Sequence, residues 1–229
     1  MDTIKLEHTF RELAAHQKLK VQGTHWASLI TSYGVYQKIP AKAREVFDSI
    51  ASHPSTRRFK AELPDAVCLE ALVGVYAAHN QYQDMHQALH HAAQRGIHLT
   101  AYGANLFIKA YAASGSSGIE QARSIFDQMQ DPPVGVAAAG NHGPRLHGAG
   151  AAQVPSRDPA FATPADPSNP WSSIFREPST YEEMIKAELS QGHIPAAQSL
   201  LQRMHSRAFP PPIIMRAEAL IQEAGSAQM

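Results

Sequence analysis

The stretch from 101 to 129, AYGANLFIKAYAASGSSGIEQARSIFDQM, constrains the fold more than any other part of the chain. Each half places apolar side chains on one helical face: Ala104, Phe107, Ile108 and Tyr111, then Ala122, Ile125, Phe126 and Met129. Residues 114–118, SGSSG, interrupt the pattern, because Gly costs backbone entropy and Ser competes for backbone hydrogen bonds. We expect a helical hairpin that is too short to bury its own apolar face and therefore needs neighbours.

The same two patterns recur along the chain. The first-helix pattern is a pair of apolar residues with Tyr three positions after the second, and it occurs at Leu29-Ile30-Tyr33, Leu72-Val73-Tyr76 and Phe107-Ile108-Tyr111. At Met184-Ile185-Glu188 the same pattern has Glu in place of Tyr. The second-helix pattern follows each time, at Ala43/Phe47/Ile50, Met85/Leu89/Ala92, Ala122/Phe126/Met129 and Ala197/Leu201/Met204. Leu72 and Phe107 are 35 residues apart, as are Met184 and Ala219, where another helix is expected to open. This period predicts a helical solenoid in which each hairpin rests on the next.

The period, the motif Tyr-x-Ala-Asn-x-Phe-Ile of residues 102–108 and the motif Ala-x-x-x-Phe-x-x-Met of residues 122–129 resemble pentatricopeptide repeats. The resemblance covers about residues 22–130 and 178–224. The related tetratricopeptide repeat has 34 residues and a Leu-Gly pair that is missing here. The Pro-rich insertion and the stretch PPVGVAAAGNH are similar to long fungal, mitochondrial members of the family. The resemblance implies a right-handed α-solenoid, single-stranded RNA (organellar transcripts) as the ligand, and a mitochondrial location.

We therefore predict an all-α chain of antiparallel helical hairpins in 35-residue repeats, interrupted by a long disordered insertion. Residues 1–130 would hold a half-repeat and three hairpins, 131–178 the Pro/Gly/Ala-rich insertion, and 179–229 the last hairpin and a capping helix. Trp171, Ile174 and Phe175 could dock back onto the helices. Thr24 and the pair Ser179-Thr180 are expected N-caps.

The N-terminus lacks the Arg- and Ser-rich, acid-poor composition of a mitochondrial presequence. Leu6, Phe10 and Leu13 occupy second-helix positions, so we expect the chain to begin halfway through a repeat. Our hypothesis is a C-terminal fragment of a longer protein or a truncated gene product. An in-frame upstream extension of the transcript would support it, and a stop codon directly upstream would contradict it.

Composition limits the possible functions. Twenty basic and twenty acidic residues balance, whereas most nucleic-acid binders carry a basic excess. A single cysteine, Cys68, excludes a disulfide framework and a cysteine metal quartet. No apolar run approaches the roughly 18 residues of a membrane span. The pair His86 and His90 has metal-binding spacing but no third ligand beside it. With no nucleophile elbow or phosphate loop either, the sequence predicts no enzyme, cofactor or metal site.

The resemblance also implies where RNA would bind. The family reads bases with the fifth and last residues of each repeat, which are here Ala27, Glu70, Asn105 and Glu182, and Thr100 and Pro212. Only Asn105 matches the family's preference, and the glutamates would repel phosphate. Lys109, Lys186 and Arg216 are expected groove cations. The basic cluster Arg57, Arg58 and Lys60 could contact phosphates or form a solvated loop.

Three functional hypotheses follow. The first is an RNA-associated protein of organellar RNA processing, stability or translation. The second is a protein-binding solenoid scaffold that does not contact RNA, and the third is a degenerate fragment without function. Salt dependence separates the first two, because phosphate contacts weaken steeply with salt and apolar protein interfaces do not. Tyr33, Tyr76 and Tyr111 share an apolar pattern and are expected to pack between hairpins rather than stack on bases.

Overall fold

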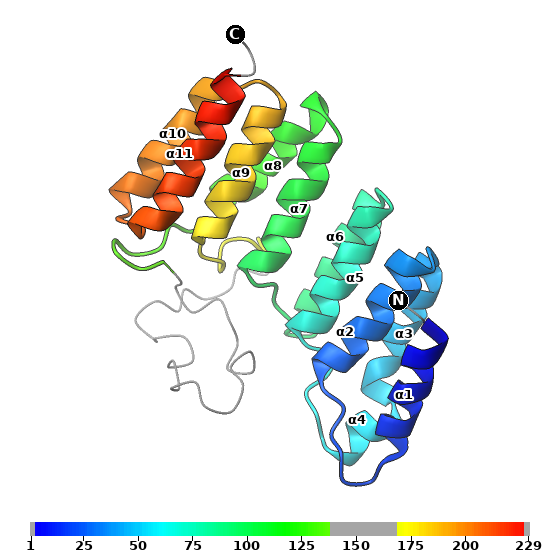
Figure 1. Ribbon diagram of the computed structural model, residues 1–229. Coiled ribbons are helices and arrows are strands. Elements are labelled where there is room, and N and C mark those ends of the chain that lie inside the picture. Colours follow the sequence, from blue (N-terminus) through cyan, green and yellow to red (C-terminus); the bar gives the residue numbers. More distant parts are fainter. Residues whose placement is uncertain (1–2, 138–168, 227–229) are drawn as a thin grey trace. The chain divides into compact units, whose positions relative to one another are not determined.

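A computed structural model describes residues 3–137 and 169–226 (Figure 1). The described part of the chain is helical and contains no strand, which confirms the all-α prediction. The helices form two compact units, Met1–Leu99 and Thr100–Met229. None of the described helices has both the length and the apolar character needed to cross a bilayer.

The first unit contains two helical hairpins preceded by a single helix. Its elements are α1 (Thr3–Ala15), α2 (Gly23–Thr31) with a π-helical extension (Ser32–Tyr36), α3 (Pro40–Ser49) with a 3₁₀ extension (Ile50–Ser52), α4 (Pro54–Arg58), α5 (Ala66–Ala78) and α6 (Tyr82–Gln94). Helix α2 packs along α5, and each also packs against its hairpin partner. Phe10 of α1 is buried, with its ring 4.5 Å from that of Trp26. The half-repeat helix thus contributes its central aromatic residue to this core.

The second unit is built in the same way. It contains α7 (Ala101–Ala113), α8 (Ser116–Gln128), α9 (Pro178–Ser190), α10 (Ile194–Ser206) and α11 (Pro211–Ser226). Helix α7 packs against its partner α8 and against α9, and α9 packs against α10 and α11 (Figure 1). The first helices of neighbouring hairpins therefore lie side by side within this unit.

The predicted hairpin of residues 101–129 is confirmed, with a shorter turn than expected. Its apolar faces are buried, including Phe107 and Phe126. The turn comprises residues 114 and 115 only, and Gly115 has a φ of 87°, a conformation that favours glycine. Gly118 lies inside α8, where a Cβ atom would come within 2.0 Å of the Tyr111 carbonyl oxygen. The glycine thus permits close approach of the two helices instead of ending one.

Three details of the predicted register were wrong. The N-cap of α2 is Gln22 rather than Thr24, because His25 Nδ1 accepts a hydrogen bond of 2.9 Å from the Gln22 amide. Helix α11 begins at Pro211, and Ala217 is buried while Ala219 is exposed, so the step from Met184 is 33 residues rather than 35. In α10 Leu200 is buried, whereas Leu201 is only partly so. Where apolar residues lie close together in the sequence, the pattern does not show which of them is buried, so the predicted register can be wrong by one or two residues.

The N-cap of α9 is Glu177, one turn before the expected pair. Thr180 nevertheless takes part, because its hydroxyl accepts a 3.2 Å hydrogen bond from the Glu177 amide. Its neighbour Ser179 lies in the first turn of the helix. Pro178 fills the first helical position, where the missing N–H costs nothing.

The end of the predicted insertion packs on the second unit. Trp171, Ile174 and Phe175 are buried, as expected, and the Trp171 ring lies 4.9 Å from that of Phe107 in a T-shaped arrangement. Gln130 exchanges backbone hydrogen bonds with Ile174 and Arg176, at 2.9 and 2.8 Å. The predicted disordered insertion comprised residues 131–178. Its part from 138 to 168 lies outside the described residues, whereas disorder was wrong for its two ends, where Asp131 and Arg176 form an ion pair. The two flanks of the insertion are thus joined to each other.

Two tyrosines are less buried than the packing prediction required. Tyr76 is 5% exposed, whereas Tyr33 and Tyr111 are partly exposed. The Tyr33 hydroxyl donates a 2.6 Å hydrogen bond to Glu7 of α1. Burial, and then this hydrogen bond, raise the pKa of Tyr33 to about 12. Tyr33 therefore ties α2 to the preceding helix.

Candidate functional site

The predicted base-reading residues are all fifth in their helices, but they differ in environment. Ala27 of α2 and Glu70 of α5 lie in the first unit, where α2 and α5 pack together. Ala27 is partly exposed and Glu70 is buried. Asn105 of α7 and Glu182 of α9 occupy the same position in the second unit. Among these four, only Asn105 carries an amide suited to a base edge.

Asn105 joins α7 to the start of α9. Its Nδ2 donates a 3.1 Å hydrogen bond to Ser179 Oγ, and the residue is 9% exposed. Its Oδ1 is buried and has no hydrogen-bond partner among the described residues. In Asn105, Nδ2 therefore connects α7 to α9 by a hydrogen bond, whereas Oδ1 remains a buried acceptor without a partner in the described part of the chain.

Thr100 serves as the N-cap of α7. Its hydroxyl accepts a 3.2 Å hydrogen bond from the Tyr102 amide, and the residue is buried. This capping role accounts for its polar side chain without an RNA contact. Pro212, the other predicted last position, lies in the first turn of α11.

The acidic side chains of α9 are each paired with a cation. Arg216 of α11 donates a 2.8 Å hydrogen bond to Glu182, and Lys186 donates one of 2.7 Å to Glu183, one turn away. Arg216 and Lys186 are exposed, whereas the side chains of Glu182 and Glu183 are only 17% and 25% exposed. Of the two glutamates that the sequence suggested would repel phosphate, Glu70 and Glu182, the second is thus offset by Arg216, and Lys186 offsets the neighbouring Glu183.

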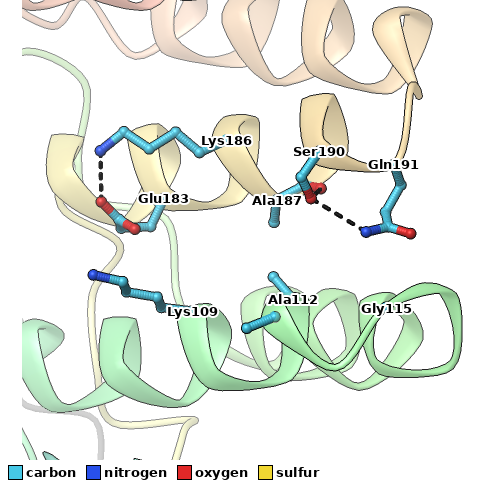
Figure 2. A pocket seen from close by; sticks show the side chains of 9 residues that line it. Lys109, Ala112, Gly115, Glu183, Lys186, Ala187, Ser190 and Gln191 are labelled. Atoms are coloured by element: carbon cyan, nitrogen blue, oxygen red, sulfur yellow. Dashed lines mark hydrogen bonds and ion pairs between the residues drawn. The ribbon is translucent and has the colours of Figure 1, made fainter. Parts of the chain in front are cut away.

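A groove of about 410 Å³ lies between the C-terminal halves of α7 and α9 (Figure 2). Lys109, Lys186 and Glu183 stand at one end, and Ser190 and Gln191 at the other, with small residues such as Ala112 and Ala187 between them. Lys109 and Lys186 are both ninth in their helices. In the described part of the chain, Lys109 forms no ion pair. The structure thus brings together two of the predicted cations, with Asn105 one turn from Lys109 along α7.

The predicted basic cluster lies in the first unit and is only partly a loop. Arg57 and Arg58 end the short helix α4, Lys60 follows it with a φ of 47°, and all three are exposed. Arg58 donates a 3.2 Å hydrogen bond to the carbonyl oxygen of His16, just after α1. This contact places positive charge at the end of α1, where the helix dipole favours it.

Sequence analysis did not predict the buried ion pair at Glu188, which occupies the position of Tyr33, Tyr76 and Tyr111 in the recurring pattern. Arg123 of α8 forms a bidentate pair with Glu188, with both N–O distances 2.7 Å, and His193 Nδ1 lies 3.0 Å from the same carboxylate. Burial by itself would raise the pKa of Glu188, but the hydrogen bonds from Arg123 and His193 outweigh it and lower the pKa. The presence of Glu188 where the pattern otherwise has Tyr was the one sequence signal of this ion pair, but it did not identify Arg123 as the partner.

A second cluster surrounds Asp131 at the flank of the insertion. Arg176 and Tyr181 bond to Oδ1, and Arg207 donates to Oδ2 at 2.8 Å, with Arg203 at 3.5 Å. Burial alone would raise the pKa of Asp131, yet hydrogen bonds from Tyr181 and Arg176 and the nearby cations lower it to about 2. This non-periodic segment carried no sequence signal for the cluster, which holds the insertion flanks against α9 and α10.

Within residues 3–137 and 169–226 no group of three or more His, Cys, Asp or Glu side chains could hold a metal ion. His86 and His90 lie in α6 and have no such third ligand there. A smaller cavity of about 210 Å³ in the first unit is lined by Arg44, Asp48 and His91, among others. Arg44 is bonded to Asp48 at 2.7 Å.

The fold and this groove define a protein of packed helical hairpins with a partly cationic surface between two neighbouring first helices. Comparison with models of known protein families and with curated protein sequences gives no match for this chain.

Proposed function

We propose that this chain is a helical-repeat protein of the pentatricopeptide type, whose hairpins form a right-handed α-solenoid that associates with single-stranded RNA. In this proposal it acts in an organelle, in RNA processing, stability or translation, as the sequence resemblance implies. The observation that carries the RNA proposal is the groove between α7 and α9, with Lys109 and Lys186 at equivalent positions.

The two lysines offer positive charge to the phosphates of an RNA strand. They stand on neighbouring first helices and are both exposed, so their charges reach solvent. Each lysine that neutralises a phosphate releases condensed counterions from the RNA, and this release contributes to affinity. The pairing of Glu182 with Arg216 and of Glu183 with Lys186 removes part of the repulsion that an RNA strand would meet.

The test is binding of a fluorescently labelled single-stranded RNA to the full chain, measured by anisotropy at several salt concentrations. The variant Lys109→Ala/Lys186→Ala is expected to bind more weakly, and the slope of log affinity against log salt should fall by about 0.7 for each lost contact. Lys18→Ala/Lys20→Ala is the matched control, because both lysines are exposed and lie in the first unit. Absence of RNA binding by the unaltered chain would contradict the proposal.

The second candidate is a protein-binding scaffold. The zero net charge and the presence of Glu182 and Glu183 beside the groove support it, since RNA binders usually carry a basic excess. Crosslinking in cells of origin would separate the two. RNA crosslinks that fall in the lysine variant favour RNA, whereas a stable protein partner recovered without RNA favours the scaffold.

A further inference from the structure

The groove between α7 and α9 has charged side chains at one end and uncharged residues at the other (Figure 2). Lys109 and Lys186 make one end cationic, with Glu183 cancelling one charge. The other end lies at the C-termini of α7 and α9, near Gly115 and Gln191. Gly115 is also the N-cap of α8, so the partial charges of the α7 C-terminus and the α8 N-terminus offset each other at this end, which carries no charged side chain. A ligand in the groove would therefore point its anionic group towards the lysines.

The middle of the groove is suited to a flat group. Ala112 and Ala187 project only methyl groups there, and Gly115 has no side chain (Figure 2). From Lys109 to Ala113, the last residue of α7, the groove extends for about 6 Å along the helix axis, and it continues to Gly115 in the turn. Its volume of about 410 Å³ falls within the range of small-ligand sites. A planar ring can lie against such an apolar surface, whereas larger side chains would fill it.

The far end offers specific hydrogen bonding. The Gln191 side chain carries both a donor amide and an acceptor oxygen, and its amide nitrogen is 3.3 Å from Ser190 Oγ. Because the amide nitrogen donates to Ser190, the side-chain oxygen of Gln191 is the atom left to accept a hydrogen bond from an amino group. Adenine and cytosine carry an exocyclic amino group on the edge that faces away from the sugar, whereas uracil carries a carbonyl oxygen there.

From this geometry we propose that the groove is a nucleotide subsite. One phosphate of the RNA lies between Lys109 and Lys186, the base lies over Ala112 and Ala187, and the amino group of adenine or cytosine points to Gln191. The subsite is separate from the fifth-position residue Asn105. The inference rests on the proposed RNA binding and adds to it a position and a preference for amino-bearing bases.

The test measures binding of three labelled RNAs, oligo(A), oligo(C) and oligo(U) of equal length, to the full chain by anisotropy. The unaltered chain should prefer oligo(A) and oligo(C) over oligo(U). Ala112→Leu, which fills the groove without changing charge, should weaken binding of oligo(A) by about tenfold, a loss in the range of one displaced base. Gln191→Ala should reduce the preference over oligo(U) and leave the salt dependence unchanged.

The controls separate failure of this inference from failure of RNA binding itself. Ala78→Ser alters an exposed residue at the end of α5, in the first unit and outside the groove lining, and should bind like the unaltered chain. Circular dichroism checks that each variant is folded. If the unaltered chain binds RNA, and the affinity falls in Lys109→Ala but not in Ala112→Leu or Gln191→Ala, then the lysines contact phosphate and the base subsite is refuted. If none of the three RNAs binds, both the subsite and the proposed function are refuted.

Discussion

Replacing Arg123 with Ala tests the buried ion pair that connects α8 to α9. The substitution leaves the carboxylate of Glu188, which is 3% exposed, without its bidentate partner. Breaking a buried pair on one side typically costs 3–5 kcal/mol. Arg123 is itself 32% exposed and His193 remains beside the carboxylate, so we expect a loss in unfolding free energy of about 3 kcal/mol.

The double variant Arg123→Ala/Glu188→Leu makes the result specific to the charge. An apolar replacement of a buried pair is often neutral, so the second substitution should recover about 2 kcal/mol of the loss. Arg11→Ala is the control, since its pair with Glu7 on α1 is largely exposed and should contribute at most about 1 kcal/mol.

The assay is urea denaturation at pH 7, followed by circular dichroism and by tryptophan fluorescence. The chain has two tryptophans, and Trp171 lies in the second unit while Trp26 lies in the first. A Trp26→Phe background therefore makes the fluorescence report on the unit that contains the pair. A loss below about 1 kcal/mol for Arg123→Ala, or no recovery in the double variant, would refute the reasoning.

Three further predictions concern the same unit. Phe126→Ala should lower the unfolding free energy by about 3–5 kcal/mol in urea, because the ring is 2% exposed and packs at 5.2 Å against that of Tyr181; a loss under about 1 kcal/mol would place Phe126 outside the core. The pKa of Asp131 is lowered from 3.8 to about 2, so the ionised side chain stabilises the folded state above pH 3.8. This stabilisation is lost as the pH falls towards 2. Asp131→Asn should therefore make unfolding less sensitive to acid between these values, and unchanged acid sensitivity would contradict that assignment. Gly118→Ala should destabilise the protein by about 1–3 kcal/mol in thermal unfolding, because the new Cβ meets the backbone of Tyr111. Gly225→Ala in α11 is the control, since its Cβ has open space and the substitution should be neutral or stabilising. Equal effects of the two substitutions would contradict a close approach of the helices at Gly118.

The candidate site was only partly accessible from sequence. Asn105, Lys109 and Lys186 could be identified because they fall at fixed positions of a repeating helix. Their partners could not, because an ion pair such as Glu182 with Arg216 joins residues 34 apart through packing. The groove itself depends on the small residues Ala112 and Ala187, which in a sequence are indistinguishable from ordinary helix formers.

The sequence by itself determined the helices and their hairpins. Apolar residues repeat at helical spacing in 101–129, and glycines and prolines interrupt them near the observed turns, so local patterns were sufficient. Tertiary structure decided what depends on residues far apart in the chain. The pairing of Arg123 with Glu188 and the attachment of Trp171 and Arg176 to the hairpin arise from packing across 50 or more residues. No periodicity encodes such contacts, because they depend on which helices meet and how closely they approach.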